Sequence, residues 1–342
     1  MQARGFQFFD DEGARYQGGA ILYAVTGYLA SFAGLFADSW VVNAIAIALL
    51  GHAMTIAAYL VHECGHNTVF RNNRDNARLG GMMSWICGAS YGTFEDMRFK
   101  HFRHHVDNGD LVWFDYEAWF AEHRFVLKWT QRLEWWYIPA HELIMHGIMV
   151  FTSFVIPQRV SQRRRNLFVI VLRGGLYLLL LVFFPVVAAF YALAYMMMLI
   201  VLRFMDGLQH DYGGVTTLFN KEPGPHKGDP VWEQAHTFSV PLSLKYEKVN
   251  WLVLNFGYHN AHHAKPTVPW FRLPALHRQM AGDGPVAVIP FAAQVKIYHT
   301  GRVDRIYKWQ GETVYPEGSD FLLAAQQARI PGGNAASFLT SF

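Results

Sequence analysis

The chain reads WVVNAIAIALLGHAMTIAAYLVHECGH from Trp40 to His66, so an apolar run leads directly into a pair of histidines. Residues 40–61 contain no Asp, Glu, Lys or Arg. A helix of about 20 mostly apolar residues crosses the hydrocarbon core of a bilayer, so this run predicts a membrane span. His62 and His66 lie four residues apart, which places them on one face if the helix continues. The stretch therefore predicts a helix that leaves the membrane carrying two metal ligands.

A second uncharged run precedes this span. Residues 18–37 also lack charged side chains, and only Asp38 and Ser39 separate them from residue 40. The two runs therefore predict a tight helical hairpin in the membrane. A pair of buried helices in a soluble core is the alternative, but uncharged runs of this length are typical of membrane spans.

A second hairpin is predicted further along the chain. Residues 167–184 and 186–204 are strongly apolar, and Pro185 marks the turn between them. Arg173 lies in the first arm, near a helix end, where a long cationic side chain can reach the membrane interface. The predicted fold class is all-α: an integral membrane protein with two transmembrane hairpins, four spans in total, and a helical cap that holds a dinuclear metal site.

Charge and composition indicate how the chain is oriented. Hydrophobic residues make up 52% of the sequence and charged residues only 16%, below the roughly 25% of soluble domains. Both hairpin tips lack Lys and Arg, whereas the opposite ends carry them, so the positive-inside rule places the cap and both termini in the cytoplasm. These basic residues are Arg71, Arg74, Arg78, Arg98, Lys100, Arg103, Arg159, Arg163, Arg164, Arg165 and Arg203.

Two domains are expected. Residues 1–284 form the membrane domain, in which residues 62–166 and 205–284 make the cytoplasmic cap. Residues 285–342 form a small cytoplasmic C-terminal lobe. The net charge of +3 is too small to indicate a nucleic-acid partner.

Eight of the 17 histidines lie in three clusters. Their sequences are HECGH at 62–66, HFRHH at 101–105 and HNAHH at 259–263. Residues four apart share a helix face, and eight imidazoles exceed what one metal ion can bind. Asp206 and His210 are also four apart and follow the last span, so His210 is a ninth candidate. Asp206 is a candidate ligand through water, or alternatively a helix-capping or hydrogen-bonding residue.

The candidate metal ligands and catalytic residues are therefore all histidines, apart from Asp206. They are His62, His66, His101, His104, His105, His210, His259, His262 and His263. Imidazole binds zinc, copper, iron and nickel, whereas structural zinc favours closed sites with cysteine. The pattern indicates two metal ions with open positions and leaves iron, copper and zinc as alternatives.

With these motifs the chain resembles the membrane fatty acid desaturase superfamily. That family has one HxxxH box and two HxxHH boxes around two membrane hairpins, and the HECGH form of the first box is similar to its acyl-lipid branch. The resemblance covers residues 15–280 and implies two iron ions held by the nine histidines. It also implies a polar residue at the place of Asp206, although family members often have Asn there.

The resemblance implies a reaction as well. It is O2-dependent desaturation of a fatty acyl chain, most probable for a lipid-linked substrate, with O2 as co-substrate and no bound organic cofactor. Two cysteines are too few for an iron–sulfur cluster, and no haem-binding segment is evident. Electrons are therefore expected from a separate ferredoxin, rubredoxin or cytochrome b5 with its reductase.

Other functions share some of these features. A hydroxylase or related oxygenase of the same superfamily, acting on a lipid or hydrocarbon, has the same boxes. A membrane metal transporter would place its ligands within the hydrocarbon depth, and a zinc-dependent membrane hydrolase would need fewer imidazoles. The N-terminal residues lack a targeting pattern, which favours a bacterial inner membrane over the endoplasmic reticulum.

Overall fold

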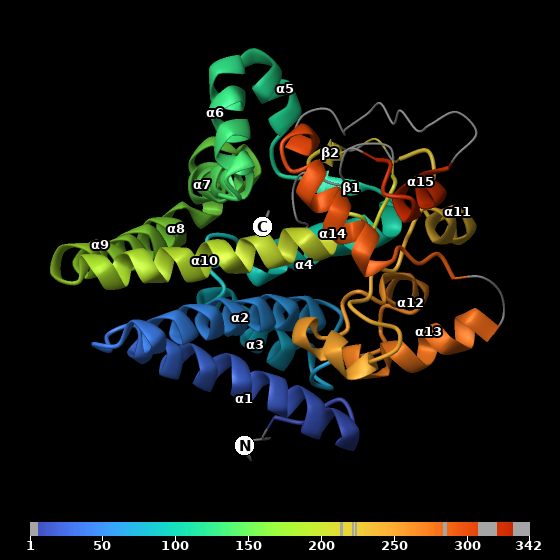
Figure 1. The fold of residues 1–342 in the computed structure, drawn as a ribbon, viewed down its shortest axis with the longest axis horizontal. Coiled ribbons are helices and arrows are strands. Elements are labelled where there is room, and N and C mark those ends of the chain that lie inside the picture. Colours follow the sequence, from blue (N-terminus) through green and yellow to red (C-terminus); the bar gives the residue numbers. More distant parts are fainter. Residues whose placement is uncertain are drawn as a thin grey trace. The chain divides into compact units, whose positions relative to one another are not determined.

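The protein is mostly helical, as predicted. The computed structural model describes residues 6–212, 215–220, 222, 224–282, 286–306 and 320–330 (Figure 1). Within these residues one small sheet pairs β1 (Asp110–Val112) with β2 (Val215–Thr217) in parallel. The chain divides into two compact units, residues 6–97 with 143–201 (unit 1) and residues 98–142 with 202–330 (unit 2), and each unit is described by itself.

Unit 1 contains the long apolar helices. Its elements are α1 (Asp11–Gly34), α2 (Trp40–Gly65), α3 (Asn73–Ile86), the start of α4 (Phe94–Asp107), most of α7 (Ala140–Val155), η1 (Pro157–Gln162), α8 (Arg163–Val169), the π-helical turn η2 (Ile170–Gly174), α9 (Gly175–Phe183) and most of α10 (Pro185–Asp206).

Three helices in the described part of the chain are long and apolar enough to cross a membrane. They are Trp40–Gly65, Pro157–Phe183 and Pro185–Asp206. Three of the four predicted spans thus coincide with such helices, although each helix is longer than its predicted span. The fourth predicted span, residues 18–37, lies on helix α1 as far as Gly34 but is not among these three. Helix α1 ends at Gly34, so the apolar residues Leu35, Phe36 and Ala37 of this run lie outside it.

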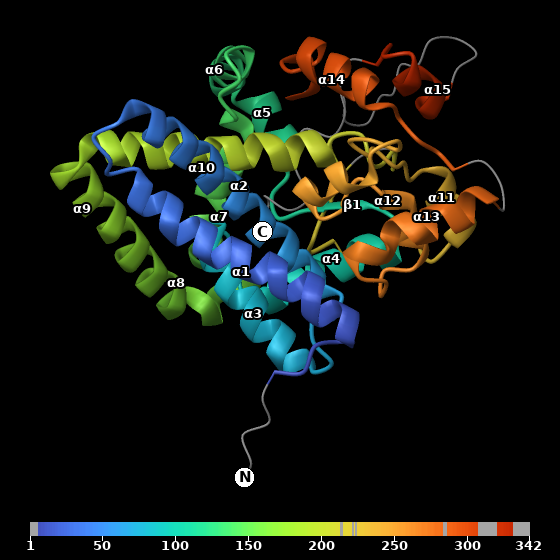
Figure 2. The same ribbon diagram turned by 60° about the horizontal axis from the view of Figure 1, so that its bottom comes forward.

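The first predicted hairpin has a compact turn. Helices α1 and α2 run side by side, and the Asn43 side chain donates hydrogen bonds to the carbonyls of Gly34, Leu35 and Ala37, each at 3.1 Å (Figures 1 and 2). These carbonyls lie at the end of α1, where no helical N–H can reach them. Asn43 therefore fixes the turn, because its side chain binds three carbonyls at and just after the end of α1.

Small residues allow close helix packing inside unit 1. A Cβ atom at Gly51 of α2 would lie 2.7 Å from the carbonyl oxygen of Ala194 in α10. Only glycine fits at such a separation, so Gly51 lets the two helix backbones approach closely, a common arrangement between membrane helices.

Arg173 is bound by neighbouring protein groups. Its Nη1 donates to the carbonyl of Trp85 at 2.8 Å and to Ser90 Oγ at 3.1 Å. These acceptors satisfy a cation in an apolar segment, and the place of Arg173 at a membrane interface stays a prediction.

The basic run Arg159–Arg165 is also bound within unit 1. Buried Arg159 donates from Nη2 to Asp96 Oδ2 at 3.3 Å and to Gln162 Oε1 at 2.8 Å. Arg163 and Arg165 donate to the main-chain carbonyls of residues 153 and 90, respectively. These three side chains therefore hold loops and helix ends of unit 1 together.

Unit 2 contains the short elements. They are the rest of α4, β1, α5 (Tyr116–Glu122), α6 (Arg124–Trp135), the end of α10, β2, α11 (Pro230–Ala235), η3 (Glu247–Val253), α12 (His259–Ala264), η4 (Trp270–Arg272), α13 (Leu273–Gly282), α14 (Phe291–Thr300), η5 (Asp304–Ile306) and α15 (Phe321–Gln326).

A buried ionic network in unit 2 joins α6, the first turn of α7, the end of α10 and η5. Arg203 at the end of α10 is fully buried and binds both carboxylate oxygens of Glu134, at 2.8 and 2.9 Å, and also Glu142. Arg305 of η5 reaches Glu134 at 3.3 Å. Arg203, one of the basic residues from which the cytoplasmic side is predicted, is therefore paired with carboxylates inside unit 2.

The predicted C-terminal lobe is only partly described. Residues 307–319 and 331–342, like Pro285, lie outside the described residues. The segment before α14 pairs with Ser239, whose N–H donates to Ala287 and whose carbonyl accepts from Ile289. The domain boundary near residue 285 stays a prediction.

Candidate metal centre

The second histidine motif lies on α4. His101 and His105 are one helical turn apart, and their Nε2 atoms are 3.3 Å from each other. Helix α4 ends at Asp107, and Asn108 then adopts a left-handed conformation with φ of 50°. The reversed chain brings the Gly109 carbonyl to 3.0 Å from His104 Nδ1. That bond orients the ring and turns Nε2 of His104 toward the other histidines, as in metal-ligating histidines.

The third motif occupies the short helix α12, where His259, His262 and His263 are all buried. The backbone just before it is tightly constrained. A Cβ atom at Gly257 would lie 2.6 Å from the carbonyl oxygen of Val240, so only glycine fits there. The Val240 N–H also donates to the Gly257 carbonyl at 2.8 Å. These contacts fix where α12 begins and hence where its histidines point.

His210 reaches the same cluster by a different route from the one predicted. The sequence places Asp206 and His210 on one helix face, but α10 ends at Asp206. His210 instead lies in an isolated antiparallel bridge with Thr237, and its Nδ1 is 3.4 Å from Thr237 Oγ1. A strand-like pairing across 27 residues therefore positions this histidine, and the helical interpretation of the spacing was wrong.

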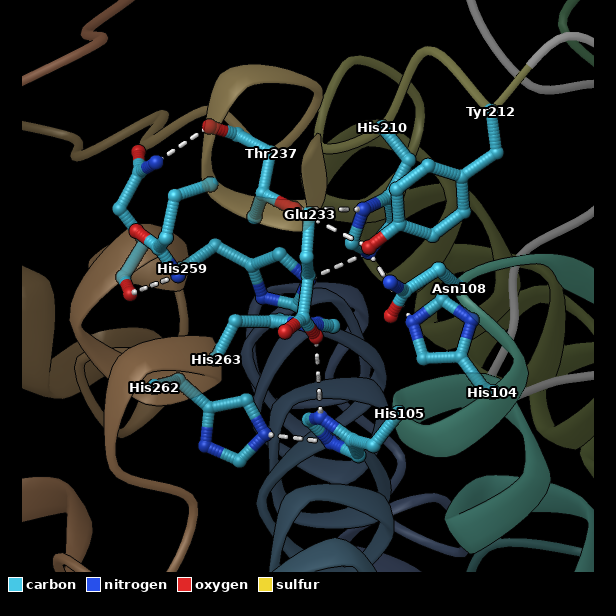
Figure 3. Close-up of polar contacts among 12 residues, drawn as sticks. His104, His105, Asn108, His210, Tyr212, Glu233, Thr237, His259, His262 and His263 are labelled. Atoms are coloured by element: carbon cyan, nitrogen blue, oxygen red, sulfur yellow. Dashed lines mark hydrogen bonds and ion pairs between the residues drawn. The ribbon is translucent and has the colours of Figure 1, made fainter. Parts of the chain in front are cut away.

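Four histidines of unit 2 converge on one point. The Nε2 atom of His210 lies 2.7 Å from that of His259 and 3.1 Å from that of His104. With His263 they form a group whose potential ligand atoms are all within 4.8 Å of one another (Figure 3). Asp206 lines the same pocket as His104, His210 and His259.

A carboxylate belongs to a second, overlapping group. Glu233 Oε1 is 2.7 Å from His263 Nδ1 and 4.0 Å from His105 Nδ1 (Figure 3). His105 Nε2 is in turn 3.2 Å from His262 Nε2, which continues the cluster to the rest of α12. Glu233 was missed from the sequence because it belongs to no histidine motif. The sequence marks Glu233 only as an acidic residue on a short helix. That helix begins with Asp-Pro, which is typical of a capped helix start.

Burial favours the neutral form of two of these imidazoles, His210 and His263. Removal from water lowers the pKa of His210 and His263 well below the usual value, and the neighbouring imidazoles lower it further. Burial likewise raises the pKa of Glu233 to about 7. Neutral imidazole is the form that binds metals. The buried Nε2 of His263 also has no hydrogen-bond partner, so a cation would satisfy it.

The first motif lies in unit 1. Helix α2 continues past the predicted span to Gly65 and includes His62, and His66 follows it directly. The two buried rings have centroids 4.8 Å apart. Glu63 accepts hydrogen bonds from Gln17 Nε2 at 3.2 Å and Thr68 Oγ1 at 2.6 Å, and it lies 3.9 Å from His62 Nδ1. The pair is thus held in place at the end of an apolar helix.

The donor set has a clear chemical character. Seven buried or nearly buried histidines of unit 2 contact one another, and one carboxylate lies beside them. Imidazole-rich sites suit iron, copper, zinc and nickel rather than magnesium or calcium, which prefer oxygen. Seven imidazoles are also more than one tetrahedral ion uses, so the residues fit a centre of more than one transition-metal ion.

Comparison with known proteins gives one family. A family model described as fatty acid desaturase matches residues 38–294, which include all nine candidate histidines and Asp206. A search of curated proteins found no match to the chain.

Proposed function

Because the chain belongs to the fatty acid desaturase family, and its structure gathers buried histidines into clusters, we propose that it is a membrane-bound di-iron oxygenase that desaturates fatty acyl chains. Membership of this family implies an oxidoreductase. The convergence of His104, His210, His259 and His263 is the observation that carries the proposal, because buried imidazoles this close together suit the binding of a transition-metal ion.

The proposed centre contains two iron ions, and its ligands come from the nine candidate histidines. His101, His104, His105, His210, His259, His262 and His263 belong to the cluster of unit 2. His62 and His66 are assigned from the first family box, and Asp206 is proposed to act through a water molecule. Bound iron would supply the activation of O2 that an unreactive C–H bond requires.

The protein residues around the histidines prepare the site. Gly109, Thr237 and Glu233 each contact the Nδ1 atom of one imidazole, which leaves Nε2 directed toward the cluster. Burial favours neutral rings at His210 and His263 and limits the access of water. The ligands are therefore oriented before any metal binds, which lowers the cost of assembling the site.

The remaining features of the proposal follow the family. The substrate is an acyl chain, most consistent with a lipid-linked one, and a separate ferredoxin, rubredoxin or cytochrome b5 supplies the electrons. We place the active site and both termini in the cytoplasm, with four spans that include α1, and we favour a bacterial inner membrane. The apolar helices and the positive-inside pattern support this topology.

Lipid analysis tests the proposed reaction. The protein is expressed in a host with a simple fatty acid profile. The acyl chains of the host lipids are then identified by gas chromatography and mass spectrometry. We expect a new double bond that is absent with His262→Ala, because removal of a ligand disables the centre. His123→Ala is the matched control, since His123 is exposed at the start of α6, and it should retain the product.

Other products would redirect the proposal. A new hydroxyl group that depends on His262 would exclude desaturation but retain the oxygenase. If the lipids are unchanged, the metal content of purified protein decides: two iron ions per chain support an oxygenase with another substrate, whereas zinc without iron contradicts the proposal.

A further inference from the structure

The proposed reaction requires electrons to enter a buried site from another protein. The point at which these electrons enter the protein rests on that proposed function. Helix α11 is a natural place to look because it begins at the protein surface: the Val231 side chain is 79% exposed. Two residues further on, Glu233 binds His263 of the cluster. The helix is thus accessible and in contact with the metal site.

Trp232 lies between these two residues in a stack of rings. Its centroid is 4.1 Å from that of His226, with 4° between the planes, and 4.0 Å from that of His236, with 18°. The Asp229 side chain accepts a hydrogen bond from the backbone N–H of Trp232, and His236 Nδ1 is 2.8 Å from the Trp232 carbonyl oxygen. The indole therefore lies against two imidazole rings, and the Trp232 main chain is held by two hydrogen bonds.

Tyr212 connects this stack to the histidines. Its ring centroid is 5.4 Å from that of Trp232, nearly parallel to it, and 4.3 Å from that of His210. It also lies 5.7 Å from the His104 ring. The Tyr212 hydroxyl is 3.0 Å from Thr237 Oγ1, which itself contacts His210. Figure 3 shows the tyrosine ring beside His210.

We propose that Trp232 and Tyr212 form the route by which electrons pass from a one-electron carrier protein at the exposed start of α11 to the metal centre. In each transfer the carrier is oxidised by one electron and the centre is reduced by one electron. The two rings act as a tunnelling bridge and are not themselves reduced. These ring contacts form a path of π systems from the exposed start of α11 to the histidines.

The competing explanation is that Trp232 only packs α11 in place. Replacement with phenylalanine and with leucine separates the two explanations. Trp232→Phe retains an aromatic ring, whereas Trp232→Leu retains apolar bulk but no π system. The same comparison applies to Tyr212→Phe and Tyr212→Leu, and Tyr212→Phe also removes the hydroxyl bonded to Thr237.

A photochemical experiment tests the route without a natural donor. Cys64 and Cys87 are both buried, so a thiol-reactive ruthenium photosensitiser attaches selectively to an introduced cysteine. The label is placed by Val231→Cys in the iron-loaded full chain. A laser flash with ascorbate as quencher generates a reductant at that site, and electron paramagnetic resonance and transient absorbance follow reduction of the iron centre.

We expect Trp232→Leu and Tyr212→Leu to slow this reduction by about tenfold or more, and the phenylalanine variants to stay near the unsubstituted rate. A label placed by Phe125→Cys on α6, which lies away from α11 in both views, is the control (Figures 1 and 2). Its slower transfer should not depend on Trp232. Reduction of all variants by dithionite and an unchanged iron content would show that the centre itself is intact.

Two results would overturn the route. Equal rates in the leucine and unsubstituted proteins would show that electrons do not pass through these rings, and an equal loss in the phenylalanine variants would indicate packing instead. Failure of the proposed function is distinguishable, because a chain that binds no iron gives no reducible centre with any label or with dithionite.

Discussion

Glu233 illustrates how one side chain can serve several histidines. Its Oε1 binds His263 Nδ1 at 2.7 Å and lies 4.0 Å from His105 Nδ1, so it influences rings from both HxxHH motifs. A carboxylate at the outer nitrogen of a ligating imidazole fixes the ring and increases its basicity. Glu233 therefore belongs to the proposed metal site, although it lies outside every histidine motif.

Removal of this carboxylate should weaken metal binding. We expect Glu233→Leu to lower the affinity for iron about 10- to 100-fold, as for comparable outer partners of ligating histidines. Glu233→Gln should have a smaller effect because its amide oxygen can still accept the bond from His263. Iron content after equilibration with a graded series of chelator buffers measures the change.

Glu122→Gln provides the control for this comparison. Glu122 is exposed at the end of α5, so its replacement should leave iron binding unchanged. Equal iron binding by unsubstituted protein and Glu233→Leu would remove Glu233 from the site.

The sequence revealed the histidines more readily than the residues that orient them. The cluster contains seven predicted ligands, whose spacing signals a shared helix face. Glu233 and Tyr212 carry no such signal, because they meet the histidines through tertiary contacts that no local spacing encodes. His210 is an intermediate case: its membership of the cluster was predicted, but through a helical spacing that the bridge with Thr237 replaces.

At the scale of elements, the end of α10 depends on buried charge. Arg203 and Arg305 face Glu134 and Glu142, so two cations balance two carboxylates away from water. Burial alone would raise the pKa of Glu142, but Arg203, His141 and Arg305 together outweigh it and lower the pKa to about 2. Glu142 is therefore ionised at neutral pH and depends on its partner.

Loss of Arg203 should be strongly destabilising. Arg203→Met leaves buried carboxylates without their main counter-charge, and breaking a buried pair in this way costs about 3–5 kcal/mol. The exposed pair of Arg278 and Glu247 offers a matched comparison, for which Arg278→Met should cost less than about 1 kcal/mol.

Denaturant unfolding of the purified protein in detergent measures both variants. A similar small loss in both would show that the buried network adds no more to stability than a surface pair. Helix α10 ends at Asp206, three residues after Arg203, and Asp206 lines the pocket beside the histidines. A large loss of stability in Arg203→Met is therefore expected to disturb that pocket as well.

Helix ends were less predictable than helix positions. Hydropathy located the runs around α2, α9 and α10, because a long apolar segment is visible in composition alone. Hydropathy did not reveal that the helix containing α9 begins as early as Pro157. The charged residues Arg159, Arg163 and Arg165 suggest a loop in the sequence, and only the structure shows that they bond to neighbouring groups.

For the whole molecule, orientation in the membrane is the main prediction that composition supports. The two native cysteines are buried, so a membrane-impermeant maleimide reports only introduced ones. With Asp38→Cys at the tip of the first hairpin, intact cells should be labelled. With Glu122→Cys on α5, labelling should require broken cells, because the positive-inside rule places the cap in the cytoplasm.

Labelling of both positions from the same side would contradict the predicted topology, including the assignment of α1 as a span. Cells expressing the unsubstituted chain provide the background.

The turn after α4 also affects how readily Asn108 ages chemically. Asn108 precedes Gly109, and an asparagine followed by glycine is prone to deamidation because the glycine nitrogen can attack the side-chain carbonyl. Here the Asn108 amide donates to the carbonyls of His226 at 2.8 Å and Asp229 at 2.9 Å. While these bonds persist, the side chain cannot rotate into the reactive arrangement, so the lifetime of the enzyme in storage depends on the loop before α11 staying closed.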